Sequence, residues 1–165
     1  NSLKIVAKNV DAFLILGNKF HALGAALSVT KPIILLDPYN EEIANMESLK
    51  NKIIKQRFAA IEKAKQAKVF GIIVGVKEGQ QFGSVEYAME KLQKLKKQYV
   101  VVTMNEITSD KLINLYNVDV FVELACPRIA IEDVAKFAKP LLTAREFAVV
   151  VGDLAWNELL ERGFL

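Results

Sequence analysis

Six short stretches of the chain are apolar at nearly every position and rich in β-branched residues, with little alternation between apolar and polar positions. Strands that are covered on both faces show this pattern, which is typical of parallel sheets. The six predicted strands are AFLILG (12–17), PIILLD (32–37), VFGIIVG (69–75), YVVVTM (99–104), VDVFVEL (118–124) and PLLT (140–143).

Segments with helical periodicity separate these strands. The longest covers about residues 41–68, where apolar residues recur at steps of three and four along an otherwise basic sequence. Its apolar stripe comprises Ile43, Met46, Leu49, Ile53, Ile54, Phe58 and Ile61. Further helices are predicted at 84–97, 109–115, 130–137 and 144–151. The last of these starts after Thr143, because Thr143 and Glu146 have capping-box spacing. Alternating strands and helices predict an α/β fold of doubly wound, Rossmann-like units with right-handed crossovers.

One pattern occurs twice. NVDAFLILG at 9–17 is similar to NVDVFVELA at 117–125, and in both copies a Lys-Pro pair opens the following strand. The Asn that opens each copy precedes the lysine of that pair, Lys31 or Lys139, by 22 residues. We therefore expect a structural repeat of two equivalent parallel-sheet units.

The two copies differ in what precedes them. A strand, a helix, a strand and a short helix lie before the second copy, at about 69–116, and the first copy has no counterpart. The sequence thus predicts one complete unit and one partial unit, in a chain that starts part-way through a domain. The expected division is the carboxy-terminal part of one α/β domain at 1–50, a connecting helix at 51–68 and a complete domain at 69–165. A degenerate first unit that never had these strands is the alternative.

Composition excludes several classes of protein. The 165 residues are 52% apolar and 25% charged, which is globular composition and rules out disorder, collagen and coiled coil. The single cysteine, Cys126, excludes a disulfide framework and a metal site made of several cysteines of this chain. The one histidine, His21, excludes a His-rich site. The chain shows no targeting segment, and its apolar runs are shorter than the ~20 residues of a membrane span, so we expect a cytoplasmic protein.

Positive charge is concentrated in one segment. The net charge is +3, which is too small to indicate a nucleic-acid partner. Residues 50–68 hold seven basic residues against the one acidic residue Glu62. We interpret them as a solvated helix face. The seven are Lys50, Lys52, Lys55, Arg57, Lys63, Lys65 and Lys68.

Candidate sites lie in the loops that follow the strands, because ligands of open α/β sheets bind beyond the carboxyl ends of the strands. Gly75, Gly79 and Gln80 lie in a glycine-rich turn before a predicted helix, and such a turn accommodates anions. The turn matches neither a Walker loop nor a GxGxxG fingerprint, and an ordinary turn is the alternative.

A cysteine follows the strand at 118–124. Cys126 precedes Pro127 and therefore lies at a strand-to-helix corner, with the cation Arg128 beside it. The equivalent position of the first copy is Asn18, so the fold does not require cysteine at this corner. A small buried hydrophobe is the alternative for Cys126.

The strand ends of the first copy supply three weaker candidates. His21 starts a predicted helix, and Asp37 and Tyr39 follow the strand at 32–37. A capping or packing histidine and a plain Asp-Pro turn are the alternatives.

With these motifs, the sequence resembles the diphthamide-synthesis radical enzymes, the 2-(3-amino-3-carboxypropyl)histidine synthases. The resemblance covers nearly the whole chain, and ACPRIAIED together with GVKEGQ is specific. The matching strings are VDAFLILGNKFHALGAAL (10–27), KPIILLDPY (31–39), RFAAIEKAKQAKVFGIIVGVKEGQ (57–80), MNEITSDKL (104–112), VDVFVELACPRIAIED (118–133) and KPLLTAREF (139–147).

The resemblance implies a fold and a cofactor. Family members have three similar α/β domains around a central site, and each domain gives one cysteine to a 4Fe–4S cluster. The cluster cleaves S-adenosylmethionine to a 3-amino-3-carboxypropyl radical, which adds to a histidine of translation elongation factor two. Archaeal members resemble homodimers. By this resemblance Cys126 is the ligand from the third domain, and soft thiolates suit an iron–sulfur cluster.

The resemblance also implies roles for the other candidates. In the third domain, Gly75, Gly79 and Gln80 would line the S-adenosylmethionine pocket, and Arg128 would pair with the carboxylate of that substrate. In the second domain, His21, Asp37 and Tyr39 would line the same cleft.

The chain departs from the family pattern in its missing cysteines. The cysteines of the first and second domains are absent, and one thiolate cannot hold a cluster that needs three. Our hypothesis is that the chain is the carboxy-terminal half of such an enzyme and is inactive alone. The alternative is a non-catalytic doubly wound module that binds a small anionic ligand or a partner subunit.

Overall fold

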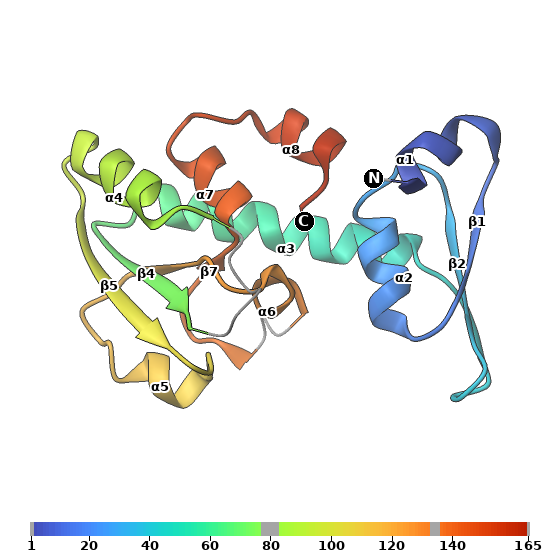
Figure 1. The fold of residues 1–165 in the computed structure, drawn as a ribbon, viewed down its shortest axis with the longest axis horizontal. Coiled ribbons are helices and arrows are strands. Elements are labelled where there is room, and N and C mark those ends of the chain that lie inside the picture. The colour runs from blue at the N-terminus through green and yellow to red at the C-terminus, as the bar shows by residue number, and fades with distance from the viewer. Residues whose placement is uncertain (1, 77–82, 133–135, 165) are drawn as a thin grey trace. The chain divides into compact units, whose positions relative to one another are not determined.

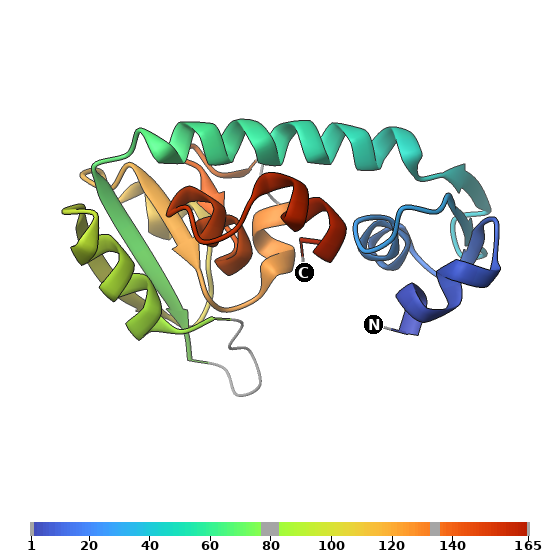
Figure 2. The same ribbon diagram turned by 90° about the horizontal axis from the view of Figure 1, so that it is seen from above.

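The computed structural model describes residues 2–76, 83–132 and 136–164. Its contacts divide the chain into two compact units (Figure 1; Figure 2 gives the same ribbon turned by 90°). Unit 1 is Asn1–Gln56 with Trp156–Leu165, and unit 2 is Arg57–Ala155. Helix α3 (Glu47–Lys65) contributes residues to both units.

Unit 1 contains a three-stranded sheet in the order β1-β2-β3. Its other elements in chain order are α1 (Ser2–Val6), η1 (Ala7–Asn9), β1 (Phe13–Leu16), α2 (Lys19–Ala26), β2 (Ile33–Asp37), β3 (Glu42–Asn45) and α8 (Trp156–Arg162). Strands β1 and β2 are parallel, and β3 pairs antiparallel with β2. Helix α2 connects the parallel pair and buries Ala22 and Leu23, so one face of this sheet is covered.

Unit 2 contains a four-stranded, wholly parallel sheet in the order β5-β4-β6-β7. Its elements are β4 (Val69–Gly75), α4 (Val85–Lys94), β5 (Gln98–Met104), α5 (Ser109–Ile113), β6 (Val120–Glu123), α6 (Pro127–Glu132), β7 (Leu141–Leu142) and α7 (Ala144–Val150). A helix follows each strand, as the alternating pattern predicts. The expected α/β fold with parallel sheets is confirmed.

The core of unit 2 lies on both faces of this sheet. On one face Ile73, Phe121 and Leu141 pack with residues of α5 and α6. On the other face the rings of Phe70 and Phe147 meet edge to face at 6.2 Å. Close packing requires a glycine at position 71, since a Cβ there would lie 2.5 Å from a ring carbon of Phe121.

The internal repeat is visible in the backbone. In both copies a Phe N–H donates to the carbonyl of the proline that opens the next strand, Phe13 to Pro32 and Phe121 to Pro140, each at 2.9 Å. The same phenylalanines open the parallel pairs β1–β2 and β6–β7 in equivalent register. The strand–helix–strand unit predicted from the two NVD strings therefore occurs twice.

The copies differ in what covers them. Leu14 and Leu16 of β1 are 63% and 69% exposed, whereas their equivalents Val122 and Leu124 are 0% and 3% exposed. In unit 2 helix α7 packs on β6 over that face, and in unit 1 the segment after β2 forms a strand instead. Unit 1 thus exposes an apolar sheet face that its counterpart in unit 2 buries.

The predicted helix at 41–68 is wrong at its start. Residues 42–45 form β3, because the carboxylate of Asp37 accepts hydrogen bonds from the backbone of Tyr39 and Asn40 and closes a turn that reverses the chain. Helix α3 begins only after Asn45, whose side chain accepts the Glu47 N–H.

The predicted apolar stripe of that helix is also wrong at two positions. Phe58, assigned to the buried face, is 45% exposed, and Ile43 is 74% exposed in β3. Arg57, assigned to the solvated basic face, is 0% exposed. The buried face of α3 follows Met46, Ile53, Arg57, Ile61 and Ala64 instead.

Other elements also differ from the sequence prediction. Helix α6 begins at Pro127 rather than at 130, since proline suits the first helical position. Helices α1 and α8 have no counterpart among the predicted elements. Residues 156–165 contact unit 1 and are counted with it. The assignment of the units to the second and third domains of a larger protein stays a prediction. Across the described ranges, no helix has the length and apolarity that crossing a bilayer requires.

Candidate functional site

Strands β4 and β6 of unit 2 are neighbours and end at the same edge of the sheet. Gly75 is the last residue of β4, and Glu123 is the last residue of β6. Beyond them lies an open hollow of about 600 Å³. It is lined by Val74, Gly83, Ser84, Val85, Glu86 and Leu124. This edge is where an open α/β sheet accepts a ligand.

The first turn of α4 forms one wall of the hollow. Ser84 caps the helix by accepting the Tyr87 N–H at 3.1 Å, and its hydroxyl donates to Glu86 at 2.8 Å. Hydrogen bonds from the Glu86 backbone N–H and from Ser84 lower the pKa of the Glu86 carboxyl group. Two residues predicted for this loop, Gly79 and Gln80, lie outside the described residues.

Cys126 lies at the corner between β6 and α6, as predicted. Its side chain is partly exposed, and Pro127 directly after it starts the helix. The Cys126 carbonyl accepts the Ile129 N–H at 3.0 Å, which closes the first turn. Arg128 is exposed in that turn. The thiol is therefore accessible on a backbone that is held on both sides.

The Glu123 side chain binds the backbone of this corner. Its side chain is 1% exposed, and its Oε2 accepts the N–H groups of Ala125 at 3.1 Å and Cys126 at 2.8 Å. Its Oε1 is buried without a hydrogen-bond partner among the described residues. Burial raises the pKa of Glu123 to about 7, and the nearby Glu146 carboxylate adds to the rise while the two N–H groups and Arg57 oppose it.

A buried ion pair binds the helix that follows this corner. The Arg57 guanidinium donates from Nε to Glu146 at 2.6 Å, and a second nitrogen bonds the other oxygen of the same carboxylate. It also donates to the carbonyls of Ala130 at 2.7 Å and Leu141 at 2.6 Å. Both side chains of the pair are fully buried. One guanidinium thus joins α3, α6, β7 and α7.

Sequence reasoning missed these buried charged groups. Glu123 interrupts an otherwise apolar strand, and Arg57 stands four residues from Ile53 and Ile61 on the apolar side of α3. A charged residue at an apolar position of a periodic pattern is the signal that marks them. Glu146 was predicted only as a capping residue; the capping box with Thr143 is confirmed, and the same carboxylate also binds Arg57.

The candidates of unit 1 gather where β1 and β2 end side by side. The Asn18 side chain caps α2 by accepting the His21 N–H at 3.2 Å, and the His21 side chain is exposed. Asp37 is 2% exposed, and its carboxylate is bound by the Tyr39 and Asn40 N–H groups and by the Asn40 side chain, which lower its pKa. Tyr39 is 95% exposed. Their role beside an S-adenosylmethionine pocket stays a prediction.

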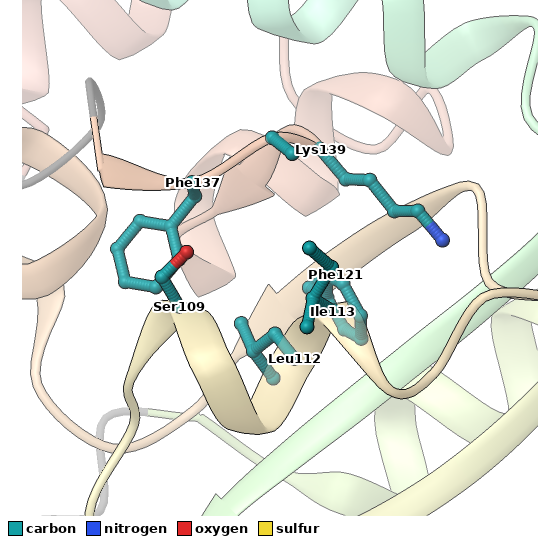
Figure 3. Close-up of a pocket in the computed structure, with 7 residues that line it drawn as sticks. Ser109, Leu112, Ile113, Phe121, Phe137 and Lys139 are labelled. Carbon is teal, nitrogen blue, oxygen red and sulfur yellow. The ribbon is translucent and has the colours of Figure 1, made fainter.

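A second pocket lies on the face of unit 2 under α5 (Figure 3). It is small and is lined by Leu112, Ile113, Phe121, Phe137 and Ala138 with Ser109 and Lys139. The Lys139 ammonium donates to the carbonyls of Leu115 at 3.0 Å and Tyr116 at 2.8 Å, so its charge stabilises the turn before β6. The lining of this pocket is mostly apolar, and its one ammonium group is bound to backbone carbonyls.

Metal binding by this chain is limited by its donors. Within the ranges that the structure describes, no three His, Cys, Asp or Glu side chains are placed to hold a metal ion together. Cys126 is a soft, partly exposed donor, so it suits one ligand position of a cluster whose other thiolates come from elsewhere.

The raised pKa of Glu123 predicts a pH-dependent stability. Below its ordinary value of 4.5 the carboxyl group is neutral in both states, and between 4.5 and about 7 the folded state holds a proton that the unfolded state has released. The stabilising contribution of the neutral group is therefore lost as pH rises through about 7. We expect Glu123→Gln, which stays neutral, to gain about 3 kcal/mol in free energy of unfolding relative to wild type between about pH 4 and pH 8.

Urea unfolding followed by circular dichroism at several pH values measures this difference. Glu90→Gln is the matched control, since Lys94 lowers the pKa of the exposed Glu90 and keeps it ionised across the upper part of this range. A difference between Glu123→Gln and wild type that does not change with pH would contradict the assignment.

Comparison with known proteins gives a family and its members. The model of the family "Putative diphthamide synthesis protein" matches residues 1–160. The 2-(3-amino-3-carboxypropyl)histidine synthase of Pyrococcus horikoshii is 31% identical over 134 residues, which are 81% of this chain and 38% of that protein. Subunit 1 of the human 2-(3-amino-3-carboxypropyl)histidine synthase is 32% identical over 156 residues, which are 93% of this chain and 36% of that protein.

A solved structure has the same fold. The crystal structure of Dph2 from Pyrococcus horikoshii with a 4Fe–4S cluster superposes with a TM-score of 0.75 at 28% identity, over 94% of this chain and 44% of that chain. The present chain thus spans less than two fifths of the length of these curated relatives.

Proposed function

The chain belongs to the diphthamide synthesis family, and on that premise we propose that it forms part of a 2-(3-amino-3-carboxypropyl)histidine synthase. The proposed reaction is transfer of the 3-amino-3-carboxypropyl group of S-adenosylmethionine to a histidine of translation elongation factor two, the first step of diphthamide synthesis. The observation that supports it is the partly exposed Cys126 at the end of β6, in a chain whose structural relative was crystallised with a 4Fe–4S cluster.

Cys126 is the residue of this chain that would hold the cluster. Its thiolate suits iron, and its single donor requires two further cysteines from a longer protein. When bound, a reduced 4Fe–4S cluster supplies the electron that cleaves S-adenosylmethionine to the 3-amino-3-carboxypropyl radical. The chain's own part is to present one thiolate from a fixed corner after the carboxyl end of β6.

The remaining candidates are proposed to bind S-adenosylmethionine. Gly75 ends β4 directly after Val74, which lines the hollow. Arg128 is exposed in the first turn of α6, and a guanidinium suits a carboxylate. Gly79 and Gln80 belong to the same loop by the sequence resemblance. His21, Asp37 and Tyr39 are proposed to contribute from unit 1. The resemblance further leads us to propose a cytoplasmic homodimer for the full-length protein.

A chimera tests this function. Residues 1–165 replace the part of the Pyrococcus horikoshii enzyme that they match, and the chimera is reconstituted anaerobically with iron and sulfide. We expect about four iron and four sulfide per chain and transfer of the group to elongation factor two, whereas the isolated 165-residue chain binds no stoichiometric cluster. A chimera that folds but binds no iron would overturn the proposal in favour of a non-catalytic module that binds an anion or a partner subunit. A stable cluster on the isolated chain would contradict the shared-ligand model.

A further inference from the structure

The two strand-to-helix corners of the repeat are held in different ways. In the first copy the Asn18 side chain itself bonds the backbone, accepting the His21 N–H at 3.2 Å. In the second copy the equivalent residue is Cys126, whose thiol makes no such cap, and the backbone N–H groups of the corner are bound by Glu123 instead. The side chain that binds the corner backbone is therefore the corner residue, Asn18, in the first copy and the strand residue Glu123 in the second.

The fold alone does not account for a glutamate at this position. The equivalent of Glu123 in the first copy is the apolar Ile15. A buried carboxyl group costs free energy that an apolar side chain avoids, and Oε1 of Glu123 lacks a hydrogen-bond partner among the described residues. What Glu123 provides in return is two hydrogen bonds to the backbone of Ala125 and Cys126.

The other end of the same segment is also held by a buried side chain. Arg57 donates to the carbonyl of Ala130, four residues after Cys126, at 2.7 Å. With the bond from Ile129 to Cys126 closing the first turn, the backbone on both sides of Cys126 is fixed. The thiol itself takes part in none of these bonds.

We propose that Glu123 is a positioning residue for Cys126: its buried carboxyl group fixes the backbone of the corner and leaves the thiol available as a cluster ligand. The proposal rests on the proposed function for the role of the thiol. The positioning of the corner can be measured without any cluster.

Amide hydrogen exchange on the 165-residue chain measures the corner directly. We expect Glu123→Met, which keeps the length of the side chain but removes the acceptor, to speed exchange of the Ala125 and Cys126 amides about tenfold or more. Glu123→Gln retains an acceptor oxygen and is expected to restore slow exchange. The Leu124 amide, which donates to Ile73 at 2.9 Å, is the internal reference and should not change.

Asp119 offers a matched control at the opposite end of β6. Its carboxylate also accepts two backbone N–H groups, from Lys68 at 2.8 Å and Val69 at 2.9 Å. Asp119→Leu should speed exchange at those two amides only. Unchanged exchange at Ala125 and Cys126 in Glu123→Met, or equal acceleration at Leu124, would overturn the positioning role.

The chimera supplies the second readout. Electron paramagnetic resonance of the reduced cluster is expected to change, with less iron bound, in Glu123→Met and to be restored in Glu123→Gln. An unaltered spectrum and iron content in Glu123→Met, in a chimera that loses its cluster on Cys126→Ser, would overturn this inference while the proposed function stands. A wild-type chimera without iron would overturn the proposed function, and with it the ligand role that Glu123 is inferred to serve.

Discussion

Arg57→Met is expected to lower the free energy of unfolding of unit 2 by about 3–5 kcal/mol. The substitution keeps most of the apolar volume of the side chain but leaves the Glu146 carboxylate buried without its partner. The carbonyls of Ala130 and Leu141 lose their donor as well. A domain of this size has a total stability of about 5–15 kcal/mol, so the loss is a large part of it.

Urea unfolding of the 165-residue chain measures this loss. Lys63→Met is the matched control, because Lys63 is an exposed basic residue of the same helix, and its substitution should change stability by about 0.5 kcal/mol or less. The double variant Arg57→Met with Glu146→Leu should recover much of the loss, since it removes the uncompensated charge. A loss below about 1 kcal/mol in Arg57→Met would show that the buried pair does not hold unit 2 together.

Cys126→Ser in the chimera is expected to remove the cluster. A hydroxyl group is nearly the size of a thiol but is a poor ligand for iron in a cluster, and a cubane left with two thiolates is not held. Bound iron and sulfide should fall to the level of unreconstituted protein, and group transfer should cease.

Two comparisons keep this result specific to the thiol. Ser109→Ala, in the apolar pocket under α5, should leave iron content and transfer unchanged. The circular dichroism spectrum of Cys126→Ser should match that of the parent chimera, because the backbone bonds of the corner do not use the side chain of residue 126. Full iron content in Cys126→Ser would show that the ligand lies elsewhere.

Local sequence signals located the elements of unit 2 well. The apolar runs of β4 and β6 and the capping box of α7 depend on contacts within a few residues, and the structure confirms them. The Cys-Pro pair placed Cys126 at a corner for the same reason, since proline ends a strand pattern and starts a helix.

Periodicity failed where a turn or a distant partner overrides it. A helical stripe was extended through Ile43 into a segment that pairs with β2, because the turn closed by Asp37 offered a strand partner. Arg57 was assigned to solvent because its charge matches the basic surface of α3. The carboxylate that neutralises it is 89 residues away.

The sequence located some of the candidate site residues and missed others. The sequence placed Gly75, Cys126 and Arg128 at strand ends of one sheet, which follows from the parallel topology. It assigned Gly79 and Gln80 to a loop outside the described residues. It did not identify Glu123, whose hydrogen bonds depend on how the corner closes over the end of β6.

The sequence by itself predicted the strand–helix alternation, the internal repeat and the corner of Cys126. Each of these depends on residues that are close in sequence or repeated at a fixed spacing. Only the tertiary structure showed that Arg57 and Glu123 are buried, that residues 42–45 form β3, and that β1 exposes an apolar face. Burial and pairing are set by which distant segments pack together, and a charged side chain becomes a structural anchor only when such a segment brings its partner.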